Sequence, residues 1–387
     1  MNDGVSSAAT MPKIKIIECF VVEQQLEQPF LFSQWAYTHR AICLVKIVAE
    51  DGTFGWGEGY GPAEIVKAGI DLLKPLVLGS DPLATSAIWQ AMYLKTLDYA
   101  RSGVLTASIS AIDVALWDLK GKLLGQPVHI LLGGKRRATV RVYATGMYFT
   151  EGGELAAKLA REAAGYAAKG FRAMKMKVGH SFAQDLKNVR AVRAAIGPDI
   201  ALMIDANHAY SRSEARALCR AVEPLDIGWF EEPLSPEDYA GYAELRQQTD
   251  IPVAAGEGEY LVHGFKRLLE GQCVDIAQPD TCAAGGLTEM QRIIALVRAH
   301  NVDLTPHCWG TGIGFAAGLH LASTLDANPG RLNSPEPLLE MDRTENPLRD
   351  RLTQPCFEVS NGAVVVPDTP GLGIDVDPDL LEQFALR

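Results

Sequence analysis

The chain has 387 residues, more than one ordinary domain, although a single α/β barrel can occupy roughly 200–250 residues. Hydrophobic residues make up 48% of it and charged residues 21%, a composition typical of soluble globular proteins. The net charge of −11 disfavours nucleic acid as a partner, and no apolar run approaches the roughly 18 residues that a membrane span requires. We therefore expect a barrel with a second, smaller domain.

The cysteines and the N-terminal residues indicate in which cellular compartment the protein acts. The seven cysteines include no CxxC pair, which indicates a reduced cytoplasmic protein with neither a disulfide framework nor a zinc site. Residues 1–11 are mostly small and polar, and they lack the charged and apolar regions of a signal peptide. We expect them to form a disordered tail.

Residues 12–136 predict an α+β domain. KIKIIECFVV alternates in the manner of a strand, and AICLVKIVAE predicts a second strand that ends in a turn at Asp51-Gly52. The stretch LTASISAIDVALWDLKGKLLG predicts a helix, because Ile112, Leu116 and Leu119 share one helical stripe. Gly125 closes this helix.

Residues 137–339 change to short apolar strands, beginning with RVYATG, that alternate with helices such as the one expected at about 151–169. The end of each later strand is marked by a polar residue, and these residues recur about every 26 positions, as strand–helix units of a parallel barrel do. They are Lys177, Asp205, Glu231, Glu257, Asp280, His307 and Glu336. A doubly wound open sheet is the alternative. It gives no reason for an ionisable residue at every strand end, whereas in a barrel these ends converge on one mouth. We therefore predict an α/β fold, a (β/α)8 TIM barrel. Residues 340–387 predict a hairpin and loop that return to the N-terminal domain.

Three carboxylates end consecutive strands: Asp205, Glu231 and Glu257. Carboxylates that converge at one height repel each other unless a cation lies between them. A set of oxygen ligands without Cys or His suits a hard ion, Mg²⁺ first and Mn²⁺ second. Separately, each could be a surface acid at a strand end; their common register favours a metal site.

Two lysines, Lys175 and Lys177, precede Asp205 by one strand and lie on one face of it. A second lysine and a divalent cation would lower the pKa of Lys177, so that its amine could act as a general base. Lys175 would tune the charge and could contact a substrate carboxylate. The alternative is a pair of lysines whose ammonium groups reach solvent.

Across the predicted barrel, Asp280 and His307 end neighbouring strands. A carboxylate beside an imidazole fixes its tautomer and raises its basicity, which predicts a second acid–base group opposite Lys177. Glu336 could donate a hydrogen bond to a developing oxyanion if it stays protonated. Together these residues predict abstraction of a proton next to a carboxylate, through an enediolate stabilised by the metal.

With these residues, the sequence resembles the enolase superfamily, mandelate racemase subgroup, over nearly its whole length from about Lys13. The motifs are AIDVALWDLKGK, the K-x-K strand, D-A-N, EEP, GE, QPD and a terminal His and Glu. The resemblance implies an N-terminal capping domain completed by the C-terminal segment, and a modified barrel. It also implies Mg²⁺ on the three carboxylates, Lys177 and the His307–Asp280 pair as bases, Glu336 as the electrophilic acid, and a homo-oligomer, dimer or octamer.

Within the subgroup the sequence resembles galactarolactone cycloisomerases, in MIDANHAYS, WFEEPLSPE, PHCWGTGIG and EPLLEMDRTENPLR. Such enzymes convert an aldarolactone to a linear 3-deoxy-2-keto diacid. Acid-sugar dehydratases and racemases or epimerases with the same catalytic residues are the alternatives, and a non-catalytic relative that binds Mg²⁺ and a carboxylate is a remote one. Two capping loops, at about 26–40 and 55–64, should set specificity. The first is poor in cations, which favours a lactone or a monoacid over a linear diacid. The candidate substrate-binding residues are Asn207, His208, Tyr148, Trp309, Trp35 and Tyr60.

Overall fold

The computed structural model describes residues 11–326, 332 and 336–386 of the chain, so nearly all of the expected N-terminal tail lies outside the described residues. The N-terminal domain has an antiparallel sheet of three strands, β1 (Ile14–Leu31), β2 (Ala36–Ala49) and β3 (Phe54–Gly59). Its helices are α1 (Ala63–Val77), α2 (Thr85–Lys95), α3 (Val104–Leu124) and the short α4 (Val128–Leu131). The predicted strands, the turn after β2 and the helix that ends at Gly125 are all present.

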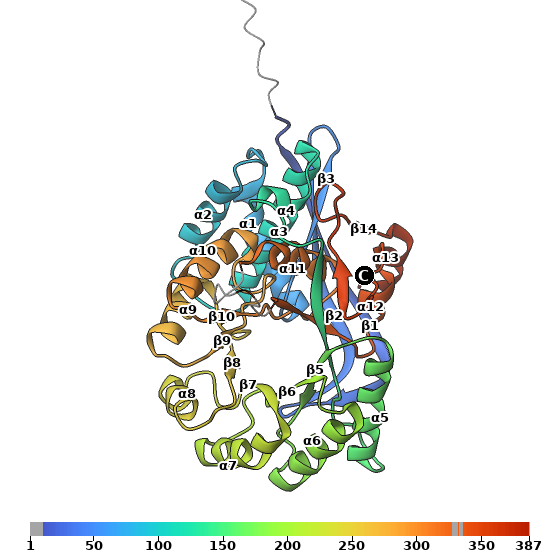
Figure 1. Ribbon diagram of the computed structural model, residues 1–387. Coiled ribbons are helices and arrows are strands. Elements are labelled where there is room, and N and C mark those ends of the chain that lie inside the picture. Colours follow the sequence, from blue (N-terminus) through green and yellow to red (C-terminus); the bar gives the residue numbers. More distant parts are fainter. Residues whose placement is uncertain (1–10, 327–331, 333–335, 387) are drawn as a thin grey trace, which may run out of the picture.

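Eight parallel strands form the second part, and Figure 1 shows helices arranged around them. Seven follow one another in chain order: β4 (Thr139–Gly146), β5 (Ala173–Lys177), β6 (Ala201–Asp205), β7 (Ile227–Glu231), β8 (Val253–Ala255), β9 (Ile276–Ala277) and β10 (Asp303–Leu304). The eighth, β11 (Leu338–Asp342), pairs with β4 on its other side. This order, with a helix between successive strands, confirms the predicted (β/α) barrel.

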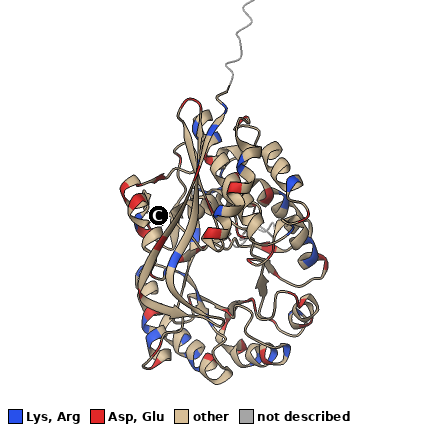
Figure 2. Cartoon of the chain, turned by 180° about the vertical axis from the view of Figure 1, so that it is seen from behind, with Lys and Arg blue, Asp and Glu red and all other residues tan. Residues whose placement is uncertain are grey.

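The barrel helices pack their apolar faces on the strands. They are α5 (Leu155–Ala168), α6 (Phe182–Ile196), α7 (Arg212–Val222) with the 3-10 turn η1 (Glu223–Leu225), α8 (Tyr239–Arg246), α9 (Leu261–Glu270), α10 (Gly286–Ala299) and α11 (Gly312–Thr324). The helix expected at about 151–169 is α5. Figure 2 shows residues of both charges interspersed along the outer helices. Within the described residues, no helix has both the length and the apolar character that crossing a bilayer would need.

The C-terminal segment contacts both parts of the molecule. It contains α12 (Pro347–Arg351), β12 (Thr353–Gln354), β13 (Ala363–Val365), β14 (Asp375–Val376) and α13 (Pro378–Phe384). β13 pairs antiparallel with the barrel strand β4, while the backbone N–H of Leu386 donates to the carbonyl of Val21 in β1 at 2.9 Å. The expected boundary between residues 339 and 340 falls inside β11.

The first capping loop is mostly strand. Residues up to Leu31 belong to β1 and those from Ala36 belong to β2, so only a short turn remains of the loop expected at about 26–40. The first half of the second expected loop, residues 55–59, is likewise part of β3. The turn docks on the barrel mouth, because Ser33 Oγ and Gln34 Nε2 donate to the carbonyl of Asn207 at 2.9 and 3.0 Å. The N-terminal domain therefore covers the carboxyl ends of the strands.

Candidate active site

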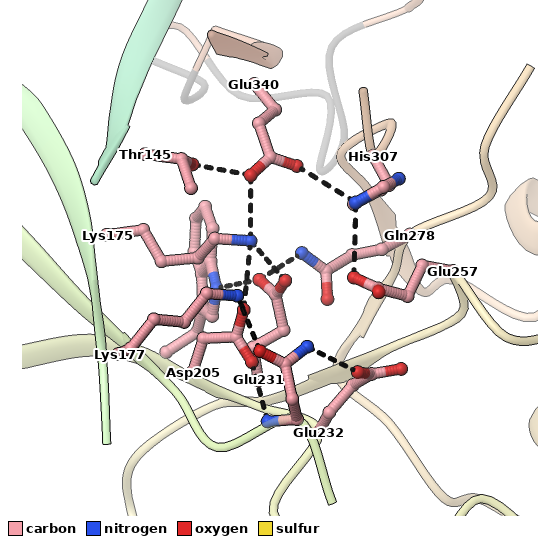
Figure 3. Close-up of polar contacts among 12 residues, drawn as sticks. Thr145, Lys175, Lys177, Asp205, Glu231, Glu232, Glu257, Gln278, His307 and Glu340 are labelled. Atoms are coloured by element: carbon pink, nitrogen blue, oxygen red, sulfur yellow. Dashed lines mark hydrogen bonds and ion pairs between the residues drawn. The ribbon is translucent and has the colours of Figure 1, made fainter. Parts of the chain in front are cut away.

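The carboxyl ends of β5 to β7 place lysines against carboxylates (Figure 3). Lys177 pairs in register with Asp205, and Asp205 with Glu231, across the parallel strands. Lys175 lies two residues before Lys177 and therefore on the same face. Its ammonium group contacts Glu231 and lies 3.0 Å from Glu340 and 3.5 Å from Asp205. Both lysines therefore lie against a group of acids, where the sequence pattern predicts them.

Lys177 is held by two acceptors. Its Nζ donates to Asp205 Oδ2 at 2.5 Å and to Asn207 Oδ1 at 2.6 Å, and it lies 5.0 Å from the centre of the Tyr148 ring. Burial lowers the pKa of Lys177, but Asp205 and the neighbouring acids raise it more, so the net shift is upward. The expected lowering of this pKa therefore depends on a divalent cation beside the lysine.

His307 lies on the opposite side of the site from Lys177 (Figure 3). Its Nδ1 is 2.6 Å from Asp280 Oδ2, and its Nε2 is 3.3 Å from Glu257 Oε2. Burial lowers the pKa of His307, but Glu257, Glu340 and Asp280 outweigh this effect and raise it to about 10. The predicted pairing of Asp280 with the imidazole is present.

The placement of Glu336 at the mouth is wrong, and Glu340 takes that place. β11 begins only at Leu338, so Glu336 lies before the strand, where it is exposed. Glu340 is 1% exposed. It accepts from Thr145 Oγ1 at 2.5 Å and lies 3.8 Å from His307 Nε2. Burial raises the pKa of Glu340, but Lys175 and His307 lower it further, so that it is depressed overall. In this arrangement Glu340 is a carboxylate and not a neutral acid.

Glu232 also belongs to the site, although strand alternation predicts that it points away. β7 ends at Glu231 and Glu232 has a φ of 44°, so the alternation breaks there. Its buried carboxylate accepts from Asn207 Nδ2 at 3.2 Å and lies 3.2 Å from His208 Nε2. Burial and the nearby Glu257 raise the pKa of Glu232. No pattern in the sequence indicates this turn.

The predicted metal ligands lie together, but their oxygens contact nitrogen donors. Glu231 accepts from Lys175, Trp229 Nε1 and Gln278 Nε2, and Asp205 accepts from Lys177. Among the described residues, no three His, Cys, Asp or Glu side chains are arranged to hold a metal ion. Burial and the nearby acids raise the pKa of Glu231 even though Lys175 lowers it. Several carboxyl groups therefore lie close enough together to disfavour ionisation of Glu231. Oxygen donors from consecutive strand ends still fit a hard divalent cation.

A cavity of about 140 Å³ opens between the mouth and the N-terminal domain. All six candidate substrate-binding residues line it, together with Lys177, Glu257, His307 and Glu340. The N-terminal domain contributes Phe32, Gln34, Trp35, Tyr37 and Tyr60. Lys175, Asp205, Glu231 and Asp280 are not among the lining residues. The aromatic side chains of the N-terminal domain, together with Trp309, form one side of the cavity, which we call the aromatic wall. The cavity thus presents both predicted bases to a ligand beneath this wall.

Arg40 supports this wall without lining the cavity. It is 5% exposed, forms an ion pair with Asp342 at 2.8 Å, and its guanidinium lies 4.1 Å from the centre of the Trp309 ring. Asp342 also pairs with Arg349 at 2.7 Å. The charge of Arg40 is therefore already matched by a carboxylate of the barrel. The planar guanidinium group of Arg40 packs on the Trp309 ring and holds it in position.

Comparisons with known proteins agree with this architecture. Residues 16–133 match the mandelate racemase/muconate lactonizing enzyme N-terminal domain, and residues 158–380 match the enolase C-terminal domain-like family. The D-galactarolactone cycloisomerase of Agrobacterium fabrum is 41% identical over 97% of this chain and 99% of its own. The arabinonate dehydratase of Saccharolobus solfataricus is 35% identical over 89% of this chain and 91% of its own.

Solved structures are similar over the same length. The 3,6-anhydro-D-galactonate cycloisomerase from Zobellia galactanivorans is 52% identical and superposes with a TM-score of 0.89, over 97% of this chain and 100% of that one. A racemase from Streptomyces coelicolor A3(2), solved with bound magnesium, is 29% identical with a TM-score of 0.85, over 96% of this chain and 100% of its own. The chain therefore belongs to the mandelate racemase/muconate lactonizing enzyme family and is an enzyme of the enolase superfamily.

Proposed function

We propose that the protein is a cycloisomerase that opens a cyclic sugar acid with one free carboxylate. It would remove the proton on the carbon next to that carboxylate and expel the ring oxygen from the following carbon. The observation that supports this proposal is the distribution of charge around the cavity. The described residues that line it include three basic side chains, Lys177, His208 and His307, and all of them come from the barrel.

Among its described residues, the N-terminal domain adds no cation to the cavity. Its contribution is aromatic and amide side chains, and the nearby Arg40 is already paired with Asp342. A linear dicarboxylate would place its second carboxylate against this wall without a partner, which is costly in a buried site. A ring with one carboxylate matches the wall better, because the apolar face of a sugar ring can pack on aromatic side chains.

The chemistry follows from the two bases on opposite sides of the cavity. One of the pair Lys177 and His307 takes the α-proton, and the electron pair of the broken C–H bond forms a double bond to the next carbon. The C–O bond of the ring breaks, and the ring oxygen keeps that electron pair. The other base then donates a proton to the carbon that carried the ring oxygen, and the enol hydroxyl gives up its proton, so that a 2-keto, 3-deoxy acid forms. In a 3,6-anhydro sugar the expelled ring oxygen takes up a proton and becomes a hydroxyl group, whereas in a lactone it becomes a carboxylate oxygen and the proton passes to solvent. No atom is lost overall, so the reaction is an isomerisation.

Asp205, Glu231 and Glu257 would hold Mg²⁺, or Mn²⁺ in its place, and the ion would stabilise the negative charge that develops on the substrate carboxylate. The chain's own residues supply the remaining electrostatics. Lys175 adds positive charge next to Glu231 and Glu340. Glu340, which accepts from Thr145, adds negative charge 3.8 Å from His307 Nε2, on the side of the imidazole opposite the contact with Asp280.

Two ring acids belong to this class. A lactone of an aldarate has one free carboxylate, and a 3,6-anhydro-aldonate also has one, with its ring oxygen on the carbon adjacent to the α-carbon. The names of the two cycloisomerases that resemble this chain contain these substrates. Dehydration of an open-chain aldonate or aldarate is the second candidate function, because the resembling arabinonate dehydratase shares the family.

Steady-state kinetics with Mg²⁺ separate the two functions. We would compare kcat/KM for D-galactarolactone, 3,6-anhydro-D-galactonate, galactarate and arabinonate under one set of conditions. The proposal expects one of the two ring acids to be preferred by at least about 100-fold, the range that misplacement of a reacting group costs. A preference for an open-chain acid would replace the cycloisomerase with a dehydratase.

We also propose that the enzyme acts in the cytoplasm as a homo-oligomer, a dimer or an octamer. The seven cysteines support the location, since none is paired in a disulfide. Light scattering coupled to size-exclusion chromatography tests the assembly directly. A mass near the 41.9 kDa of one chain would contradict it.

A further inference from the structure

Glu58 is a buried carboxyl group outside the acid–base set. It lies in β3 of the N-terminal domain, is 1% exposed and reaches the first turn of α11 in the barrel. Both of its oxygens lie 3.1 Å from the backbone nitrogen of Thr311, and the Thr311 hydroxyl also donates to it. Thr311 is the N-cap of α11. Burial raises the pKa of Glu58 to about 7, although the hydrogen bonds from Thr311 lower it. The helix dipole favours the ionised form at this end of the helix.

The loop and the start of α11 pack closely on the Glu58 carboxyl group. A Cβ atom at Gly310 would lie 2.2 Å from Glu58 Oε1, and one at Gly314 would lie 2.1 Å from the same oxygen. Any side chain at either position would push the carboxylate away, because real Cβ contacts are not this short. Residues 308–311 connect His307 to α11, so the carboxylate holds the segment that follows the imidazole.

The neighbouring Tyr60 contacts the other half of the acid–base pair. Its backbone nitrogen donates to the carbonyl of Cys282 at 3.0 Å. The backbone nitrogen of Cys282 in turn donates to Asp280 Oδ1 at 2.6 Å. The Tyr60 ring lies 5.4 Å from the His307 ring, measured between centroids. The end of β3 therefore braces the segment after Asp280 as well as the segment after His307.

We propose that Glu58 is a positioning residue that holds His307 against Asp280 from the N-terminal domain. The inference rests on the proposed function only where it speaks of turnover. The 2.6 Å contact between His307 Nδ1 and Asp280 Oδ2 lasts only while both segments stay in place. Glu58 fixes the segment after His307, and the end of the same strand contacts the segment after Asp280. Loss of the hydrogen bonds of Glu58 should therefore loosen the contact between His307 and Asp280 while both side chains remain present.

Asp113 provides a matched control. It is also a buried acid of the N-terminal domain, in α3, and it also holds a barrel helix near its N-terminus. It accepts from the backbone nitrogen of Thr288 at 2.8 Å and from the Thr288 hydroxyl at 2.6 Å, in α10. If Glu58 only stabilised the interface between the domains, Glu58→Gln and Asp113→Asn should have the same effects.

The test is made on the full-length protein with Mg²⁺. Its first readout is the far-downfield proton NMR signal of the His307 Nδ1–H, identified by its loss in His307→Asn. We expect Glu58→Gln to broaden or shift this signal, and we expect Asp113→Asn to leave it unchanged. The second readout is turnover of D-galactarolactone and 3,6-anhydro-D-galactonate. We expect Glu58→Gln to lower kcat by about 10- to 100-fold, the range for a displaced reacting group, with a smaller change in KM.

An unchanged signal in Glu58→Gln, or the same change in both variants, would overturn the proposal. If Glu58→Gln does not fold, Thr311→Val replaces it, since it removes one donor to Glu58 and should shift the signal in the same direction. An unchanged signal in folded Thr311→Val would also overturn the proposal. If the wild type turns over neither ring acid, the proposed function fails, but the NMR comparison still decides the role of Glu58.

Discussion

The replacement Lys175→Met tests the charge balance of the site most severely. The Lys175 side chain is 1% exposed and lies against three carboxylates, Glu231, Asp205 and Glu340. Methionine fills a similar volume but carries no charge. In the variant the three acids would share only Lys177 and His307 as cationic partners among the contacts that the structure shows.

Removing one member of a buried ion pair costs about 3–5 kcal/mol in the free energy of unfolding, because it leaves a buried charge without compensation. Burial already raises the pKa of Glu231, so in the variant this acid can take up a proton and limit the loss. We therefore expect a loss near the lower bound, about 3 kcal/mol. Urea unfolding of both proteins in a chelator measures it.

Magnesium should reverse most of this loss, since a divalent cation supplies the charge that the variant lacks. We expect saturating Mg²⁺ to raise the free energy of unfolding of Lys175→Met by more than that of the wild type. Lys187→Met is the control, because its partner Glu154 is exposed and 3.4 Å away. That pair should contribute less than about 1 kcal/mol. A loss below about 1 kcal/mol for Lys175→Met, or an equal gain from Mg²⁺ in both proteins, would refute the reasoning.

Three further predictions address the bases, a buried acid and the aromatic wall. Lys177→Ala or His307→Asn should lower kcat by about 10²- to 10⁴-fold, while calorimetry still detects Mg²⁺ binding. Wild-type turnover in both variants would contradict the two-base assignment. Burial raises the pKa of Asp113 to about 7, so the folded state holds this proton more tightly than the unfolded state. The stabilisation is present at low pH and is lost as the pH rises toward 7. The stability of the wild type relative to Asp113→Asn should therefore fall by on the order of 4 kcal/mol between about pH 4 and about pH 8, and a flat difference in urea unfolding would exclude the shift. Arg40→Met should cost about 2 kcal/mol in urea unfolding, less than a fully broken pair, because Asp342 keeps Arg349; it should also raise KM by releasing Trp309, and an unchanged KM would contradict that link.

The periodic part of the site could be predicted from the sequence. Lys177, Asp205 and Glu231 end strands that pair in register, so their spacing along the chain predicted their proximity. The six candidate substrate-binding residues line one cavity for a related reason. They follow strand ends or lie in the part of the N-terminal domain that covers those ends.

Errors arose where backbone geometry departs from the repeat. The repeat predicts that Glu336 ends the last strand, but β11 begins only at Leu338 and Glu340 occupies the site. The stretch LLEMD, with apolar residues around an acid, was the signal for it. The positive φ of Glu232 and the contact of Glu58 with Thr311 involve a local turn and residues far apart in the chain. Neither leaves a pattern that periodicity can detect.

The central claim is that ring opening begins with removal of the α-proton, and isotope labelling in D₂O tests it most directly. The protein would be incubated with Mg²⁺ and D-galactarolactone or 3,6-anhydro-D-galactonate, and the products followed by proton NMR. The account predicts that a ring acid disappears and that a 3-deoxy-2-keto product forms with one deuterium at C3. Exchange at the α-carbon without ring opening, or conversion of open-chain acids alone, would contradict it.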